Sequence, residues 1–396
     1  MHILVLHNYY GSSSPSGENI VVDQEIKELQ RQGHIVKKVA LYSDTVRSKG
    51  YITRALAGLS YIFSLSSYRK VSSVIKLFKP DVIYIHNVFP LLSPSVFWAA
   101  RNYAIVYTLH NYRLICPRAL PYRDGGICTK CIDSGNLLNA VKYKCYNDSY
   151  AQTIIMITSG YLHKWIGTYK KVNKFVFLSN FQKNLFKQQL KSDKRSCVKY
   201  NMPPNTISPS PDKQKNKHFL FVGRLSNEKG VDLLLNAWQK SELKDWHLNI
   251  VGDGPQKKLL QNLVDSNCEN ISFLGSLHHE AVLKQIRSAE CIVIPSRWFE
   301  GFPLVLAEAI SMGCPVILTK LGPLYEIGKK IDATFFEYEN VNSLKDALED
   351  VSKIDSRRIA QIKDLSNNFY LNELEKEKNI QKLEKIFLAA IKSNRN

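Results

Sequence analysis

Two basic residues in the second half of the chain have the types and spacing of a diphosphate site. Arg224 and Lys229 lie in the segment GRLSNEKG, residues 223–230, between an apolar run and a helical pattern. A forked guanidinium and a compact ammonium together neutralise a diphosphate. Open α/β sheets bind ligands at the carboxyl ends of their strands, where these two residues would lie. A solvated loop with two surface bases is the alternative interpretation.

Two carboxylates that follow a second apolar run suit the hydroxyl groups of a sugar or a ribose. Glu300 and Glu308 lie in FEGFPLVLAE, residues 299–308. Pro303 suits the first position of a helix, where the backbone N–H groups beyond it can bind an anion or sugar oxygens. Gly301 lets a ligand approach the backbone closely. Because Glu308 lies in an otherwise apolar run, its burial requires a polar partner.

The elements that position these residues repeat along the whole chain. Short apolar runs alternate with helical patterns, which is typical of parallel sheets with crossover helices. The runs lie at residues 2–7, 35–41, 82–86, 104–110, 175–178, 219–222, 248–251, 271–274, 291–294 and 315–319. The chain has 396 residues, more than the roughly 250–300 at which one core stops growing. We therefore predict an α/β fold of two Rossmann-like, doubly wound domains that face a cleft.

A stretch with four prolines at residues 201–217 is the best candidate for the linker between these domains. It predicts an N-terminal domain over 1–205, with a cysteine-bearing loop at 116–145. A C-terminal domain follows over 206–371. A last amphipathic helix over 372–396 can pack on either domain, including back on the N-terminal one.

These motifs together resemble a known family. Glu300 and Glu308, with Arg224 and Lys229 upstream, resemble the donor-site pattern of the retaining GT-B glycosyltransferases of family 4, also called glycosyl transferases group 1. The resemblance extends over essentially the whole chain. Four smaller motifs are also similar. A glycine loop lies at Ser16-Gly17-Glu18, where Ser-Gly replaces the family's glycine pair, and a His-Asp pair lies at His110-Asn111, where Asn replaces Asp. A glycine turn lies at 251–255 and a phosphate-side loop at 321–323.

The resemblance implies a role for each matching residue. Arg224 and Lys229 hold the diphosphate, Glu308 binds the ribose hydroxyls and Glu300 contacts the donor sugar. In the N-terminal domain, Gly17 lets the first loop approach the phosphate, and His110 lies near the anomeric carbon and the primary hydroxyl of the sugar. The implied catalytic residues are His110, Glu300, Arg224 and Lys229. The implied donor-binding residues are Gly17, Arg224, Lys229, Glu300, Gly301, Phe302, Pro303, Leu304, Val305 and Glu308.

The implied activity is a retaining glycosyl transfer from a nucleotide-diphosphate sugar, such as a UDP- or GDP-sugar. The N-terminal domain would receive a lipid-linked or oligosaccharide acceptor, in the synthesis of a bacterial surface polysaccharide such as capsule, O-antigen or lipopolysaccharide. No catalytic metal is expected, because Arg224 and Lys229 supply the positive charge at the diphosphate.

Four of the eight cysteines fall within 30 residues, as Cys116, Cys128, Cys131 and Cys145. A C-x2-C pair with two outlying thiols has the spacing of a tetrahedral zinc site. A subset of the family has a similar four-cysteine loop. A structural zinc is the main hypothesis for this loop, and reduced thiols or an iron–sulfur cluster are the alternatives.

The net charge of +19 is concentrated in the first half of the chain. Residues 1–210 contain 28 Lys and Arg against 10 Asp and Glu, whereas the two classes almost balance beyond residue 210. Basic, aromatic-rich segments at 51–70 and 154–174 resemble helices that lie on an anionic membrane, although amphipathic helices packed on a core give the same pattern. No apolar run is long enough to span a bilayer, and the N-terminus lacks the features of a signal peptide. We predict a cytoplasmic protein at the inner face of the membrane.

Two other functions fit parts of the sequence. A GT-B-like nucleotide-sugar 2-epimerase would have a similar donor half. A zinc-containing nucleic-acid-binding protein would fit the charge and the cysteines, but the chain has no nucleic-acid-binding motif, and the nearly neutral second half with its paired glutamates does not suit such a protein. No nucleic-acid partner is therefore expected.

Overall fold

The structure is a computed structural model that describes residues 1–10, 16–43, 60–190, 193–204, 217–266 and 268–395. The chain forms two compact units. The first contains Met1–Pro121, Thr129–Tyr200 and Lys376–Asn396, and the second contains Tyr122–Cys128 and Asn201–Glu375. Most of the predicted linker (205–216), part of the predicted first loop (11–15) and part of the basic segment 51–70 (51–59) lie outside the described residues.

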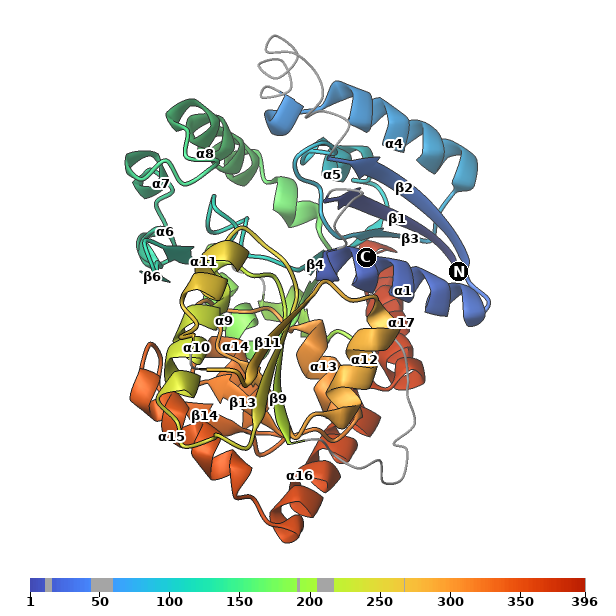
Figure 1. The fold of residues 1–396 in the computed structure, drawn as a ribbon. Helices are drawn as coiled ribbons and strands as arrows, with labels where there is room; N and C mark the ends of the chain where they lie inside the picture. The colour runs from blue at the N-terminus through green and yellow to red at the C-terminus, as the bar shows by residue number, and fades with distance from the viewer. Residues whose placement is uncertain (11–15, 44–59, 191–192, 205–216, 267, 396) are drawn as a thin grey trace. The chain divides into compact units, whose positions relative to one another are not determined.

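The first unit is built on a six-stranded parallel sheet, in the order β2-β1-β3-β4-β7-β8 (Figure 1). Its strands are β1 (His2–Tyr9), β2 (Ile35–Tyr42), β3 (Val82–Ile85), β4 (Ala104–Leu109), β7 (Lys174–Phe177) and β8 (Ser196–Val198). Its longer helices are α1 (Gly17–Arg31), α4 (Leu65–Phe78), α8 (Tyr150–Trp165), α9 (Asn180–Leu190) and α17 (Lys376–Arg395), and its shorter ones are α5 (Ser95–Ala99), α6 (Lys130–Ser134), α7 (Asn139–Lys142), η1 (Thr168–Lys171) and η2 (Asp193–Arg195).

The second unit repeats this plan, with the parallel order β11-β10-β9-β12-β13-β14. Its strands are β9 (His218–Val222), β10 (His247–Val251), β11 (Ile271–Gly275), β12 (Cys291–Ile294), β13 (Val316–Thr319) and β14 (Thr334–Phe336), with a small β5 (Tyr122–Arg123) and β6 (Gly126–Ile127) hairpin. Its helices are η3 (Asn227–Lys229), α10 (Val231–Gln239), α11 (Lys257–Asn262), α12 (His279–Ser288), α13 (Leu304–Ser311), α14 (Gly322–Gly328), α15 (Val341–Ser352), α16 (Ser356–Phe369) and the π-helical turn η4 (Tyr370–Leu374).

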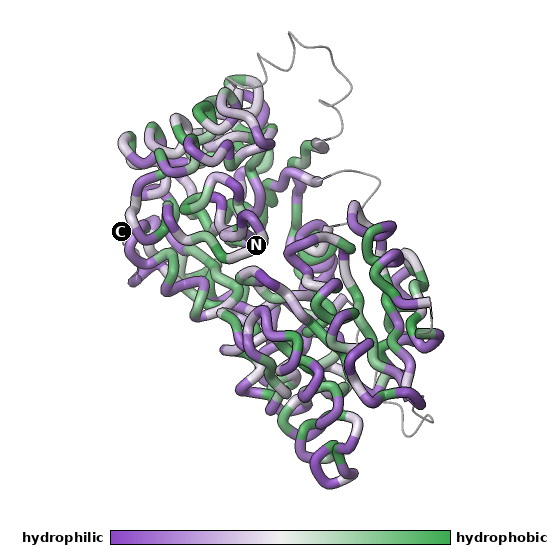
Figure 2. The backbone as a smooth tube through the Cα atoms, turned by 60° about the vertical axis from the view of Figure 1, so that its left-hand side comes forward, coloured by the Kyte–Doolittle hydropathy of each residue, from purple (hydrophilic) through white to green (hydrophobic). Residues whose placement is uncertain are grey.

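Strands that helices cover on both faces of a parallel sheet are apolar along their length, and hydrophobic stretches run through the interior of each unit (Figure 2). Every residue of β3, β4, β12 and β13 is buried. In the second unit α10 packs on α11 and α15, while α13 packs on α12 and α16. In the first unit α17 packs on α1 and on strands β3, β4 and β7, although it comes from the far end of the chain. The predicted fold class, two doubly wound α/β domains, is confirmed.

The strand order reverses once in each sheet. After β1 the chain continues outward to β2 and then returns to place β3 on the other side of β1; β9 lies in the same way between β10 and β12. Loops that leave the carboxyl ends of strands at such a point diverge and open a crevice, which is where ligands bind in this architecture. In the first unit this point lies at the ends of β1 and β3, and in the second unit it lies at the ends of β9 and β12.

Apolar patterning predicted most elements correctly but missed the shortest ones. The ten predicted strands are all present, with ends that differ by at most two residues from the predicted ranges. The two edge strands β8 and β14 have three residues each and were not predicted. The last helix begins at Lys376 rather than at residue 372, because the backbone of Glu375 is extended after the turn η4. In the part of the chain that the structure describes, no helix has the length and apolarity to cross a membrane.

We predict that Gly252→Ala destabilises the second unit strongly. Gly252 has a φ of +139°, and a Cβ built there would lie 1.8 Å from the carbonyl oxygen of Gly223, in the loop after β9. The loop must shift to accommodate the methyl group, at a cost of about 3 kcal/mol or more. Thermal unfolding followed by circular dichroism should therefore begin at a clearly lower temperature.

Gly275→Ala is the matched control for this prediction. Gly275 also has a positive φ, +68°, but no atom lies within 4 Å of the built Cβ. The Gly275→Ala substitution should lower the free energy of unfolding by only about 1 kcal/mol, through backbone strain. Equal effects of the two substitutions would contradict the close approach of the two loops.

Candidate active site

The donor-type residues of the second unit lie in the loops at its reversal point. Lys229 ends η3, which follows β9, and Glu300 follows β12. The ammonium of Lys229 donates to Oε1 of Glu300 at 2.7 Å, and the same oxygen accepts from the hydroxyl of Ser296 at 2.6 Å and the indole N–H of Trp298 at 3.0 Å. Glu300 is only 4% exposed. The structure therefore brings Lys229 and Glu300 together, as one preformed charged pair.

Arg224 is placed differently. Its side chain is exposed, and within the described ranges no hydrogen bond or ion pair to its guanidinium is found. All of its donors are thus available to a ligand at the end of β9. An exposed, uncommitted arginine loses less hydrogen bonding on binding an anion than one that must first break an ion pair.

Arg297, which sequence reasoning missed, fixes these loops to the unit. Its guanidinium makes two parallel bonds to Asp232, at 2.7 and 2.8 Å, and a third to Glu339 at 2.6 Å, and it also donates to the backbone and side-chain oxygens of Asn227. Burial alone would lower the pKa of Arg297, but its bonds to Asp232 and Glu339 raise it. Because Asn227 and Asp232 flank Lys229, this network holds the lysine loop in place. The only sequence signal of this contact is the acidic residue Asp232 in the first turn of α10.

Glu308 lies inside α13 and has a partner, as its apolar surroundings require. Nε2 of His279, in the first turn of α12, donates to its Oε1 at 2.7 Å. This hydrogen bond is the largest cause that raises the pKa of His279. The prediction that Pro303 opens the helix is wrong by one residue: α13 begins at Leu304, and Pro303 is its N-cap. Pro303 has no side chain that could cap, so the first N–H groups of α13, at Leu304 and Val305, receive no side-chain cap.

Neighbouring residues before α13 are also fixed. The carbonyl of Phe302 accepts from the side-chain amide of Asn201 at 2.9 Å. Gly301, which lies between Glu300 and Phe302 in the sequence, is also buried. The bond from Asn201 thus fixes the backbone that leads from Glu300 into α13.

His110 of the first unit lies directly after β4, at the same sheet edge as the ends of β1 and β3. Its Nε2 lies 2.9 Å from Nδ1 of His86, a residue that sequence reasoning missed. Burial is the main cause that lowers the pKa of both rings well below the usual range, so both are neutral at neutral pH. Asn111, in place of the family's aspartate, accepts from the backbone N–H of Arg113 at 3.0 Å and thus closes a local turn.

Gly17 begins α1, whose N-cap is Ser16, with the hydroxyl of Ser16 accepting from the N–H of Asn19 at 3.3 Å. The next residue, Glu18, belongs to the predicted Ser16-Gly17-Glu18 motif, although the sequence assigned it no role of its own. Burial raises the pKa of Glu18 to about 8, although the charge of Arg113 lowers it. Glu18 is therefore mostly protonated at neutral pH, and it lies 4.0 Å from Nδ1 of His7.

The structure does not support the predicted zinc site at the four cysteines of the loop. Cys128 belongs to the second unit and Cys116, Cys131 and Cys145 to the first. The thiol of Cys116 is buried against the carbonyl of Leu120. Among the residues that the structure describes, no group of three or more His, Cys, Asp or Glu side chains could hold a metal ion. A tetrahedral zinc needs four sulfurs at about 2.3 Å from one point, so the described residues give no support for the predicted zinc.

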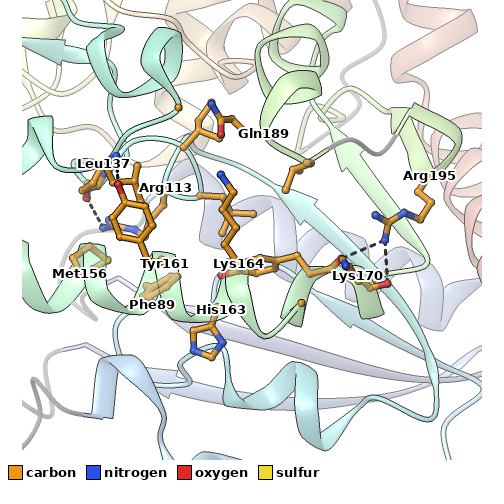
Figure 3. Close-up of a pocket in the computed structure, with 18 residues that line it drawn as sticks. Phe89, Arg113, Leu137, Met156, Tyr161, His163, Lys164, Lys170, Gln189 and Arg195 are labelled. Carbon is orange, nitrogen blue, oxygen red and sulfur yellow. Dashed lines mark hydrogen bonds between the residues drawn. The ribbon is translucent and has the colours of Figure 1, made fainter.

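A cavity of about 410 Å³ opens in the first unit, beside α8 and the segment that follows His110. Apolar side chains, among them Leu137, Met156 and Tyr161, line one side of the view in Figure 3, and Lys170 and Arg195 lie at the other. No Asp or Glu is among the residues that line it. The guanidinium of Arg195 donates to the carbonyls of residues 169, 170 and 172, which fixes this basic end. The cavity combines apolar and cationic surface.

The contact between His279 and Glu308 generates a measurable prediction. Glu308→Gln removes the first cause of the raised pKa, so the pKa of His279 should fall toward its usual value of 6.5. Glu280→Gln is the control, because Glu280 makes only the smallest contribution and should lower the pKa less. An NMR titration of the imidazole measures both. A larger fall in the Glu280 variant would contradict the contact.

Known proteins resemble the chain over both units. Residues 15–202 match the family described as Glycosyltransferase Family 4, and residues 204–368 match Glycosyl transferases group 1. An uncharacterized glycosyltransferase of Haemophilus influenzae is 31% identical over 42% of this chain and 48% of its own length. An uncharacterized 42.6 kDa protein in the cps region of Klebsiella pneumoniae is 22% identical over 90% of this chain and 92% of its own. The O-antigen biosynthesis glycosyltransferase WbnH of Escherichia coli is 31% identical over 34% of this chain and 44% of its own. The chain thus spans about half the length of two of these relatives.

Solved structures share the fold at low sequence identity. The lipopolysaccharide outer core galactosyltransferase WaaB, in its apo form, superposes with a TM-score of 0.62 at 17% identity, over 98% of this chain and 99% of that one. Anabaena Alr3699/HepE in complex with UDP gives a TM-score of 0.68 at 17% identity, over 98% and 100%. Two glycosyltransferase family models that together match residues 15–202 and 204–368, and two doubly wound sheets, thus identify the chain as a glycosyltransferase with the GT-B fold.

Proposed function

We propose that the chain transfers a sugar, with retention of anomeric configuration, from a UDP- or GDP-sugar to a lipid-linked or oligosaccharide acceptor of a bacterial surface polysaccharide. One observation carries the donor assignment. The uncommitted guanidinium of Arg224 and the Lys229–Glu300 pair lie in the loops after β9 and β12, at the point where the strand order reverses. The solved structure of Alr3699/HepE with UDP supports a nucleotide-sugar donor for this fold.

In the second unit, Arg224 and Lys229 would hold the diphosphate, and their charge would stabilise the leaving group. Glu300 would accept hydrogen bonds from the sugar and Glu308 from the ribose hydroxyls. The uncapped backbone N–H groups of residues 304 and 305 would bind phosphate or sugar oxygens. Gly301, Phe302 and Pro303 complete this donor site through their backbone.

In the first unit, Gly17 would lie beside the donor phosphate and His110 beside the transferred sugar. We assign the reaction to attack on the same face as the leaving group. The acceptor oxygen bonds to the anomeric carbon while the bond from that carbon to the phosphate oxygen breaks. The proton of the acceptor hydroxyl passes to the departing phosphate oxygen. In this scheme Arg224 and Lys229 supply the positive charge, and no divalent metal takes part.

The acceptor side is proposed from chemistry and from the relatives. Polysaccharide precursors linked to lipid diphosphates have an anionic part and an apolar part. These parts would match the cationic and apolar surfaces of the cavity in Figure 3. Relatives named for O-antigen biosynthesis or for the cps region support a polysaccharide product. The matches are to glycosyltransferase families, so neither a 2-epimerase nor a nucleic-acid-binding function is favoured.

Such an acceptor would place the chain at the inner face of the cytoplasmic membrane. The helix α8 exposes Trp165, 84% of whose surface is accessible, next to the exposed Lys164. An exposed tryptophan among basic side chains suits the interface of an anionic bilayer.

Removing either donor-site cation tests the donor assignment. A panel of UDP- and GDP-sugars first identifies the donor, because the bound sugar nucleotide raises the unfolding temperature by mass action. Arg224→Ala and Lys229→Ala should then each lower the transfer rate by at least about 10²-fold, since the leaving diphosphate loses a positive charge.

The controls are Arg357→Ala and Lys353→Ala, which remove exposed cations at α16 and at the end of α15. Both should retain the wild-type rate. Wild-type turnover in the Arg224 or Lys229 variant would refute the donor site.

Flotation with vesicles tests membrane contact. The protein should float with vesicles that contain anionic lipid at low salt and should dissociate as salt screens its positive charge. Trp165→Ser should weaken flotation, whereas Leu259→Ser, which removes an exposed apolar side chain from α11, should not. No flotation at low salt would exclude this contact.

A further inference from the structure

Two histidines of the first unit share one hydrogen bond and therefore share one choice of proton position. His86 follows β3 and His110 follows β4, and Nδ1 of His86 lies 2.9 Å from Nε2 of His110. The ring planes differ by 22° and the ring centroids are 5.2 Å apart, so the two rings lie nearly edge to edge. A neutral imidazole donates from one nitrogen and accepts at the other. The tautomer of either ring thus dictates the tautomer of its neighbour.

A buried carboxylate lies on the other side of His86. Nε2 of His86 is 3.8 Å from Oε2 of Glu25, and both side chains are almost fully enclosed. Oε1 of Glu25 accepts from the ammonium of Lys199 at 2.5 Å, and Oε2 accepts from the hydroxyl of Tyr84 at 2.9 Å. The ammonium of Lys199 and the carboxylate of Glu25 thus form a buried ion pair, in which each charge compensates the other.

The remaining groups near His86 are already committed. The amide of Asn19 donates to the carbonyl of Tyr10 at 3.0 Å, so its oxygen faces His7 and accepts from Nε2 of His7 at 3.0 Å. Nδ1 of His7 in turn accepts from the backbone N–H of Asn87 at 3.4 Å. Burial lowers the pKa of His7 to about 4, so this ring is neutral. It therefore does not compete for the proton of His86.

The charge of Glu25 decides the tautomer of His86. Among the described residues, Nε2 of His86 has no hydrogen-bond partner, and the carboxylate is the charged group that faces it. A proton on that nitrogen is attracted by the carboxylate, whereas a lone pair there is repelled. His86 then carries its proton on Nε2 and accepts at Nδ1. The N–H of the shared bond must come from Nε2 of His110.

We propose that His86, oriented by Glu25, is a positioning residue that fixes His110 with a bare, hydrogen-bond-accepting Nδ1. No described residue bonds to that nitrogen, and the side chain of His110 is only half-buried. Its ligand must be a group that donates, and a hydroxyl fits, whereas a phosphate or carboxylate oxygen meets a lone pair. The identity of that hydroxyl as one on the transferred sugar rests on the proposed function; the tautomer does not.

Imidazole nitrogen NMR of the full-length protein tests the tautomer directly. Bare and protonated ring nitrogens have well-separated chemical shifts, and the signals of His110 are assigned by their loss in His110→Asn. We expect the wild-type protein to show His110 protonated at Nε2 and bare at Nδ1. A proton on Nδ1 of His110 would overturn the proposal, whether or not the protein transfers sugars.

Three variants separate positioning from packing. His86→Phe removes the acceptor and should leave His110 as a mixture of both tautomers. The Glu25→Gln and Lys199→Met double variant removes the directing charge without leaving an unpaired buried ion, and should have the same effect. His34→Phe is the control, because His34 also lies in the first unit and contacts a carboxylate, that of Glu384 at 2.6 Å, outside this network. A single unchanged tautomer in the His86 variant would also overturn the proposal.

Kinetics give the second readout. His86→Phe should lower kcat by at least about tenfold, as expected when an active-site imidazole takes the wrong tautomer. His86→Asn should restore part of this loss, because its side-chain oxygen can accept from Nε2–H of His110. Equal losses in the Phe and Asn variants would show that His86 matters only for packing. Absence of any transfer by the wild-type protein would refute the proposed function and leave the NMR result standing.

Discussion

All strands of each six-stranded sheet run parallel, and this constraint determines where chemistry is possible in the molecule. Parallel strands place all their carboxyl ends at one edge, so loops that are far apart in sequence meet there. In the second unit this brings Lys229 and Glu300, 71 residues apart, within 2.7 Å. In the first unit it brings His86 and His110, 24 residues apart, within 2.9 Å. Strand order rather than local sequence creates both contacts.

The sequence predicted what is local or periodic and failed where a contact depends on distant residues. Runs buried on both faces of a sheet are apolar throughout, so the central strands were readily identified. The three-residue strands β8 and β14 are too short to show a pattern. The charge of Glu308 inside an apolar run indicated a partner, but nothing in the sequence indicated that it would be His279. Arg297 and His86 were missed because each gains its role only from groups brought near by the fold. The cysteine spacing suggested zinc, whereas the structure divides those cysteines between two units.

Charged side chains near the ligand-binding edge are placed differently in the two units. In the second, Arg224 at the ligand-binding edge is exposed, Lys229 pairs with the buried Glu300, and the buried Arg297 holds the lysine loop. In the first, an ion pair between Glu25 and Lys199 is buried beneath the histidines. Buried pairs of this kind rarely add stability over apolar side chains of the same volume. Its position next to His86 gives it a use in orienting a neutral ring.

The last helix has a consequence for how the chain is made. α17 packs on β3, β4 and β7 of the first unit, and its Phe387 lies edge-on to Tyr84, with ring centroids 5.1 Å apart. Phe387 and Tyr84 are both fully buried. A ribosome releases the rest of the first unit long before it synthesises residues 376–395, so the core around Tyr84 stays open while the entire second unit emerges and folds. The first domain to begin synthesis therefore cannot close until residues 376–395 have been translated.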